Sequence, residues 1–387
     1  MARERMVALS AERVDEMVRE GVAAMQRRDP ATARRLFEIL ADPASGVAPP
    51  WLLLAQACRM AGDDVAEEGA VDRLIAEQPR HLRGLLMKGD CRARAGDMRA
   101  MTSFFSLAVK LAATVEQLPP ALAAELDRAR AALAAQSRDY HAHLDSALHG
   151  VDVAAAGPRF REAADILAGR KQVYLQQPNS FYYPGLPQIQ FYDRAQFSWV
   201  AEMEAAVPAM RAELEALMAE GEAFAPYIQP RENRPQSPNP LFGDPRWGAA
   251  HIWQDGALVP EMADRCPRTV AALAAAPIPV IRERSPMALF SRLHPGTHIE
   301  PHHGMLNTRL ICHLPLIVPP GCRLRVGNDV RAWEEGKMLI FDDSIEHEAW
   351  NEGDSTRVVL LFEIWRPELD AAEREALTTL FESIVDY

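Results

Sequence analysis

The residues best suited to metal chemistry gather in one stretch of the chain, from Ser291 to Arg357. Neutral imidazole is the commonest metal ligand that proteins offer, and this stretch holds six of the eleven histidines. They are His294, His298, His302, His303, His313 and His347. Three others, His141, His143 and His149, lie in a helical pattern at spacings that put them on different helix faces. A metal site is therefore expected between residues 291 and 357.

The segments between these histidines have the character of short β-strands. Each is rich in branched or aromatic residues and is bounded by Pro, Gly, Asn or Asp. The predicted strands are Leu310–Val318, Arg323–Val326, Lys337–Phe341 and Arg357–Ile364. Short strands at close spacing with turn signals indicate a sandwich or a jelly-roll barrel. A small barrel that bears histidines is a suitable place for a redox metal.

The order of the motifs in this stretch is specific. HPGTHIEPHHG begins at His294, an N-x-x-L-x-x-H-L pattern begins at Asn307, and WEEGKMLIFDDSIEHEAW begins at Trp333, followed by Arg357. Together they resemble the aspartyl/asparaginyl β-hydroxylase family. That resemblance extends from Trp247 to Pro367 and more weakly back to about Phe181. It implies a double-stranded β-helix fold of the jelly-roll or cupin type, with Fe(II), 2-oxoglutarate and O2 as the reactants at its centre.

The resemblance also implies the metal ligands. It assigns the iron to His302 and His347. Non-haem iron oxygenases usually add a carboxylate two residues after the first histidine, and that position is Gly304 here. Because this family lacks the carboxylate, Gly304 agrees with the resemblance. His303 should point to the opposite face of the strand, and His294 and His298 are expected to make structural hydrogen bonds.

The co-substrate site follows from the same resemblance. An arginine can bind a carboxylate through two parallel hydrogen bonds, and Arg357 matches the arginine that binds 2-oxoglutarate. Ser291, His313 and Trp247 match further residues of the co-substrate pocket. The family has an arginine where this chain has Ile311, and Arg309, on the same strand face, could take its place. Either Asp342 or Asp343 could orient a ligand histidine.

Residues 1–115 carry an internal repeat. The pairs Arg28-Asp29, Gly62-Asp63 and Gly96-Asp97 recur at intervals of 34 residues, amid apolar residues at helical spacing. This period resembles the tetratricopeptide repeat, whose stacked helix pairs commonly dock a protein or a peptide. The alternative is an irregular helical bundle.

Two further segments complete the predicted organisation, a multidomain chain of α and β parts. Residues 116–170 are rich in Ala, Arg and Glu and predict a helical linker, with one long helix running from Pro119-Pro120 to about His149. Residues 171–387 form the predicted barrel domain. Within them, residues 199–220 read as one amphipathic helix, and the proline-rich stretch 226–245 reads as a loop near the active site.

Composition excludes several classes of protein. The 42 basic and 54 acidic residues leave a net charge of −12, which does not suit non-specific nucleic-acid binding. No run of about 18 apolar residues occurs, so no membrane span is expected. The charged N-terminus lacks the apolar core of a secretory signal. Five cysteines without a CxxC spacing are expected to be free thiols in the cytoplasm.

The expected function is therefore that of an iron- and 2-oxoglutarate-dependent dioxygenase. The resemblance implies hydroxylation at the β-carbon of an aspartyl or asparaginyl residue, in a peptide or protein. A free or carrier-bound amino acid and a lipid acyl chain stay open as substrates. Two rival classes remain: an iron halogenase, which also lacks the carboxylate, and a non-catalytic adaptor whose repeats carry the function.

Overall fold

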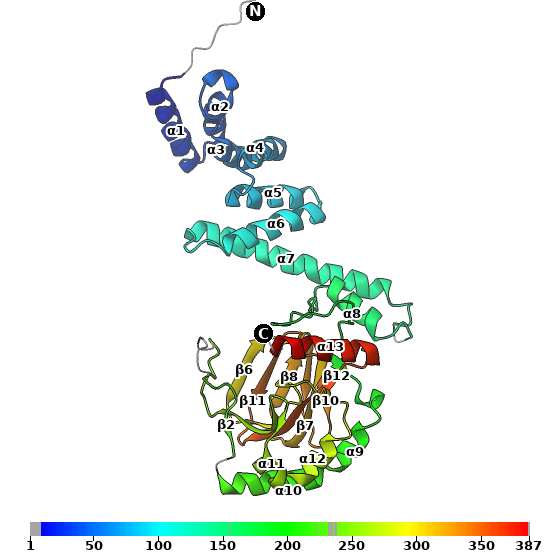
Figure 1. The fold of residues 1–387 in the computed structure, drawn as a ribbon. Helices are drawn as coiled ribbons and strands as arrows, with labels where there is room; N and C mark the ends of the chain where they lie inside the picture. The colour runs from blue at the N-terminus through cyan, green and yellow to red at the C-terminus, as the bar shows by residue number, and fades with distance from the viewer. Residues whose placement is uncertain (1–8, 154, 222, 231–234, 236–237, 386–387) are drawn as a thin grey trace, which may run out of the picture. The chain divides into compact units, whose positions relative to one another are not determined.

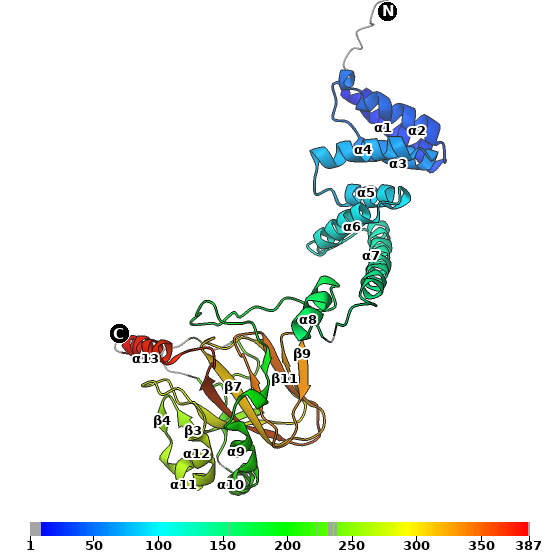
Figure 2. The same ribbon diagram turned by 90° about the vertical axis from the view of Figure 1, so that its right-hand side faces the viewer.

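The computed structural model describes residues 9–385 except 154, 222, 231–234, 236 and 237. The chain divides into two compact units, Met1–Ala164 and Asp165–Tyr387, which are taken in turn (Figures 1 and 2). The boundary falls inside the segment predicted to be a helical linker. No helix in the described ranges is long and apolar enough to cross a membrane.

The first unit consists of antiparallel helix pairs. The helices are α1 (Ala11–Gln26), α2 (Pro30–Ala41), α3 (Trp51–Ala61), α4 (Asp64–Glu77), α5 (Leu82–Arg94), α6 (Met98–Ala112) and α7 (Pro120–Ala147), with the 3-10 turn η1 (Pro43–Ser45) after α2. Helix α8 (Pro158–Leu167) follows and runs across the boundary. Each helix packs on the next along the chain from α1 to α7. The predicted tetratricopeptide-like pairs and the long helix after Pro119 are both confirmed.

The 34-residue period has a local cause at the turn inside each pair. Arg28, Gly62 and Gly96 each have a positive φ, which ends the first helix of the pair. The aspartate that follows caps the second helix: the side chains of Asp29, Asp63 and Asp97 accept hydrogen bonds from the backbone N–H of Thr32, Ala66 and Ala100, respectively. The repeated dipeptide is thus a helix stop followed by a helix start.

Close helix packing inside the pairs depends on glycine. A Cβ at Gly21 would clash with the ring of Phe37, and a Cβ at Gly89 would clash with the ring of Phe105. The two glycines, like the two phenylalanines, are 68 residues apart, which is two repeat periods. The first and third pairs therefore use the same ring-on-glycine contact.

The second unit is built on two antiparallel sheets. The larger has the order β1-β10-β7-β12-β5-β3-β2, with β4 paired to β3, and the smaller has the order β6-β11-β8-β9. The strands are β1 (Phe191–Tyr192), β2 (Ala225–Pro226), β3 (Trp247–Gln254), β4 (Ala257–Leu258), β5 (Ala288–Leu293), β6 (Thr297–His302), β7 (Arg309–Ile317), β8 (Cys322–Val326), β9 (Asp329–Ala332), β10 (Leu339–Phe341), β11 (His347–Asn351) and β12 (Arg357–Trp365). All four predicted strands are present, and the double-stranded β-helix is confirmed.

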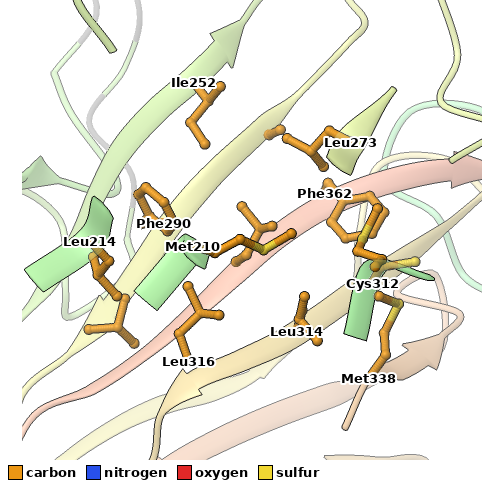
Figure 3. Close-up of a cluster of buried hydrophobic side chains, with 14 of the residues drawn as sticks. Met210, Leu214, Ile252, Leu273, Phe290, Cys312, Leu314, Leu316, Met338 and Phe362 are labelled. Carbon is orange, nitrogen blue, oxygen red and sulfur yellow. The ribbon is translucent and has the colours of Figure 1, made fainter. Parts of the chain in front are cut away.

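Helices cover the outer face of the larger sheet. They are α9 (Val200–Ala205), α10 (Val207–Glu220), α11 (Pro260–Arg265) and α12 (Pro267–Leu273); the 3-10 turn η2 (Arg194–Gln196) precedes them, and α13 (Ala371–Val385) ends the unit. In Figure 3, Met210 and Leu214 of α10 meet Phe290, Leu314 and other outward-facing side chains of the sheet. Removing these side chains from water stabilises the packing of the helices on the sheet.

One predicted element differs from the structure. Residues 199–220 form two helices, α9 and α10, with a break at Ala206. Pro208 lies in the first turn of α10, where a missing N–H is tolerated, although it would disrupt a continuous helix. The prediction of one continuous helix is therefore wrong at this proline.

Candidate active site

A cavity of about 720 Å³ opens between the inner faces of the two sheets. All seven site residues predicted from the sequence line it: Trp247, Ser291, His302, Arg309, His313, His347 and Arg357. They come from six strands. Because side chains alternate across a strand, the polar residues on the inner face share one cavity while their apolar neighbours form the outer core.

The two histidines face each other across a strand pair. His302 ends β6, His347 begins β11, and they are directly paired in the register. Their ring centroids are 4.1 Å apart. The Nδ1 atom of His302 lies 2.8 Å from the carbonyl oxygen of Glu300, and that of His347 lies 3.0 Å from that of Ile345. Each carbonyl accepts a hydrogen bond from Nδ1–H, and this tautomer leaves the Nε2 lone pair free, as a metal ligand requires.

Burial keeps both rings neutral. It lowers the pKa of His302, and it lowers that of His347 well below its usual range, with a further decrease from the neighbouring His302. A neutral imidazole can donate its lone pair to a metal at neutral pH. No group of three or more His, Cys, Asp or Glu side chains suited to a metal occurs in the described part of the chain. The facing pair His302 and His347 is the candidate donor set for a metal, and position 304 adds no carboxylate.

Gly304 is close to another carboxylate. Its N–H donates to the carbonyl oxygen of Asp343 at 2.6 Å, and a Cβ at position 304 would overlap the Asp343 side chain. Asp343 lines the cavity, and burial raises its pKa to about 6. The Asp343 carboxylate thus occupies the space that a side chain at position 304 would fill.

The neighbouring Asp342 has a different role. Its carboxylate accepts hydrogen bonds from Arg366 and from the side chain of Gln176, both at 2.7 Å, and the ion pair with Arg366 is fully buried. Asp342 therefore fixes the segment before His347 within the core. Of the two candidates from the sequence, only Asp343 lines the cavity.

At the opposite end of the inner face lies Arg357, 1% exposed. Its guanidinium carbon lies 4.6 Å from the centroid of the Trp333 ring. Its Nε and Nη1 atoms have no hydrogen-bond partner among the described residues. Burial without an anion lowers its pKa to about 10. Because a buried charge without a counter-charge is costly, this end of the cavity favours an anionic ligand.

Aromatic and polar groups surround this arginine end. The Trp247 indole N–H donates to Ser291 Oγ at 3.4 Å, and the Trp247 ring stacks on Tyr227 with centroids 4.1 Å apart. His313 has an unpaired Nδ1, and burial together with Arg357 holds its pKa well below the usual range. A neutral imidazole, a hydroxyl and a guanidinium could together bind a dicarboxylate.

Arg309 is engaged within the protein. It forms an ion pair with Glu363 and a longer one, at 3.4 Å, with Asp343. Its buried guanidinium thus compensates two carboxylates, and the pair with Asp343 holds that side chain at the cavity wall. A direct contact of Arg309 with 2-oxoglutarate stays a prediction.

Other histidines of the stretch lie outside the cavity. His298 Nε2 is 2.8 Å from Glu348, and its ring stacks on Trp350. This confirms a structural role for His298. His294 and His303 do not line the cavity either.

Sequence reasoning missed several lining residues, among them Tyr227 and His251. His251 lies four residues after Trp247 on β3, so strand alternation could have placed both on one face. The proline-rich loop 226–245 contributes Gln229, Pro230 and Asn239 to the lining. Its residues 231–234, 236 and 237 lie outside the described ranges.

Comparison with known proteins finds relatives of this part of the chain. Residues 204–367 match the family model described as Aspartyl/Asparaginyl beta-hydroxylase. The chain is 38% identical over 135 residues to the aspartyl/asparaginyl beta-hydroxylase of Homo sapiens, covering 35% of this chain and 18% of that protein. It is 40% identical over 179 residues to the ornithine lipid ester-linked acyl 2-hydroxylase of Rhizobium tropici, covering 46% and 60% of the two chains.

Among solved structures, PcrH from Pseudomonas aeruginosa matches with a TM-score of 0.29 and 20% identity, covering 34% of this chain and 98% of that one. The chain spans less than two thirds of the length of either of the two sequence relatives. The match to the Aspartyl/Asparaginyl beta-hydroxylase model covers residues 204–367, which include every candidate site residue from Trp247 to Arg357.

Proposed function

We propose that this protein is an Fe(II)- and 2-oxoglutarate-dependent hydroxylase. The observation that carries the proposal is the pairing, in one cavity, of two facing neutral histidines with a buried guanidinium that lacks an anion. In the reaction, R–H, O2 and 2-oxoglutarate give R–OH, succinate and CO2. Iron, when bound, supplies the activation of oxygen, and the protein supplies binding and position.

The residues have separate roles in this proposal. His302 and His347 hold the iron through Nε2, and their backbone hydrogen bonds set the ring orientation. Arg357 and Ser291 bind the distal carboxylate of 2-oxoglutarate, beside Trp247. Asp343, held by Arg309, offers a carboxylate that can accept a hydrogen bond from water near the two histidines.

The position of Asp343 favours hydroxylation over the halogenase alternative. A halogenase would use the space left by the missing carboxylate to hold chloride. Here that space is adjacent to the Asp343 carboxylate, which a Cβ at position 304 would already overlap. A second anion there would meet like charge at short range. Product mass measured in chloride buffer would distinguish the two reactions.

The helical repeats suit a second role, which we propose as the binding of a protein or peptide partner or of the substrate carrier. Their polar side chains form many ion pairs between neighbouring helices, such as Lys88 with Glu68 and Arg128 with Asp90. None of the proposed iron or co-substrate residues lies in the repeats. An adaptor without catalysis would leave the cavity and its buried arginine without a use.

Reconstitution tests the proposal directly. The purified protein should bind one equivalent of Fe(II) under anaerobic conditions and form succinate from 2-oxoglutarate after admission of air, slowly even without substrate. A variant with His302→Ala and His347→Ala together is the matched control and should do neither. No iron binding, or no succinate with iron bound, would refute the oxygenase assignment.

A further inference from the structure

We propose that Gln176 is a positioning residue for the two histidines, although it does not line the cavity. Its side chain joins the segment after His302 to the segment before His347 and thereby helps to fix the separation of the two rings. The inference rests on the proposed function, because this separation matters only if the rings hold one metal. Gln176 also precedes residues 204–367, the range that matches the family model.

The two histidines lie where their strand pair ends. His302 is the last residue of β6 and His347 is the first of β11, so their own pairing holds the two rings from one side only. Two connections continue on the other side: residues 303–308 lead to β7, and residues 342–346 come from β10. Contacts onto these two connections therefore decide how far the rings can move apart.

The lead-in segment, residues 176–181, lies against both connections. Its backbone N–H groups donate to carbonyl oxygens of both at 2.7–3.1 Å: Gln177 to Ser344, Asn179 to Gly304, and Ser180 and Phe181 to Met305. The side-chain amide of Asn179 also donates to the carbonyl oxygen of His303 at 2.7 Å. Both connections are thus bound to the same short segment of chain.

Gln176 makes the same link with its side chain, in the protein interior, where it is 6% exposed. Its Oε1 accepts a hydrogen bond from the side chain of Asn307 at 3.0 Å. Its Nε2 donates to the Asp342 carboxylate at 2.7 Å and to the Pro187 carbonyl oxygen at 2.9 Å. Asn307 belongs to the first connection and Asp342 to the second. An amide suits this position because it accepts at one atom and donates at the other, which an ionised carboxylate or an aliphatic side chain cannot do.

Arg366 makes a second bridge between the same two residues. Its Nη1 donates to the Asn307 carbonyl oxygen at 3.2 Å and to the Asp342 carboxylate at 2.7 Å. Arg366 therefore keeps Asp342 paired when the amide of Gln176 is removed, and no buried charge is left alone. At Gln176 the bridge can thus be weakened without the cost of an unpaired ion.

The first test needs no metal and therefore does not depend on the proposed function. Gln176→Met keeps the length of the side chain and removes the hydrogen bonds of its amide. Hydrogen exchange of the metal-free, full-length protein is followed by mass spectrometry. Exchange should become about ten-fold faster in both connections, because each loses a hydrogen bond, and should stay unchanged in α10 and β12.

Tyr183→Phe is the matched control for this test. It removes a hydrogen bond at 2.9 Å from the Tyr183 hydroxyl to Glu373 of α13, close to the lead-in segment but directed away from both connections. Exchange in the two connections should stay as in the wild type. Faster exchange of the Gln176→Met variant in one connection alone, in neither, or equally throughout the domain would overturn the inference.

The second test loads the same proteins with Co(II), whose visible absorption bands report the geometry of its ligands. Gln176→Met should bind Co(II) about 10- to 100-fold more weakly than the wild type, with altered bands, at a temperature below the unfolding of both proteins. Asn179→Ala, at an exposed position where folding is safer, should show a smaller loss. Equal affinity and equal bands in the wild type and both variants would overturn the inference. Failure of the wild type to bind Co(II) would instead refute the proposed function, and the hydrogen-exchange test would still decide whether Gln176 joins the two connections.

Discussion

Replacement of Arg357 by alanine separates binding of the co-substrate from binding of iron. The guanidinium is 1% exposed and lacks a carboxylate partner in the described cavity, so a bound dicarboxylate would be its counter-charge. A hydrogen bond to a charged group contributes about 1.5–3 kcal/mol. The Kd for 2-oxoglutarate should therefore rise about ten- to hundred-fold.

Iron binding should change little in this variant. Arg357 begins β12 in the larger sheet, whereas His302 and His347 belong to β6 and β11 of the smaller sheet. Their orienting hydrogen bonds go to backbone carbonyls and do not involve the arginine. The loss should thus be confined to the co-substrate.

The assay is an anaerobic titration of 2-oxoglutarate into the iron-loaded protein, with thermal unfolding as a second readout. At about 100 times its Kd, 2-oxoglutarate stabilises a protein that binds it by about 2.7 kcal/mol, and the variant should lose most of this gain at the same concentration. Arg357→Lys is the control: it keeps the charge without the bidentate fork and should be intermediate. Equal loss of iron and of 2-oxoglutarate would refute the reasoning and make Arg357 a structural residue.

Three further predictions follow from the packing and the charges. Gly89→Ala should destabilise the repeats by about 1–3 kcal/mol because the new Cβ would clash with the Phe105 ring. Gly69→Ala is the control: the new Cβ lies in open space on a neighbouring helix and should stabilise the repeats by up to about 1 kcal/mol. Chemical denaturation of both variants measures the difference in their free energies of unfolding. Burial raises the pKa of Asp343 in the folded protein to about 6, above the usual value of 3.8. Between these two values the folded protein binds a proton at Asp343 that the unfolded chain does not bind. Asp343→Asn should therefore raise the melting temperature of the metal-free protein at pH 8, with an advantage that shrinks towards pH 5. An advantage independent of pH would mean that Asp343 stays ionised over this range and that its pKa is not raised. Finally, a truncated chain starting at Gly157 should still form succinate, while KM for a carrier-bound substrate rises through loss of uniform binding; an unchanged KM would assign the repeats another role.

The place of that truncation illustrates how packing changes an interpretation drawn from sequence. The Ala-rich segment after Pro119 predicts a long helix correctly, but not its partner. Leu126 and Ala129 of α7 are buried against Phe105 and Leu85 of the last helix pair. A cut before α7 would expose this apolar cluster, so the repeats and α7 have to be removed together.

The sequence by itself determined the repeat period and singled out the two histidines and the arginine as candidate site residues. These are local properties: aspartate caps a helix within its own turn, and alternation on a strand assigns each side chain to a face. The order of motifs from Trp247 to Arg357 was sufficient to predict the two histidines, the arginine and the fold that brings them together.

Only the tertiary structure decided how the remaining charges are shared. Asp342 and Asp343 are neighbours of one type, yet one is buried with Arg366 and the other lines the cavity beside Gly304. The sequence does not show a partner for Arg309, whereas in the fold its guanidinium is paired with Asp343 and Glu363. The physical reason is that burial makes a charge depend on partners far away in the chain, whereas helix caps and strand faces depend on neighbours a few residues away.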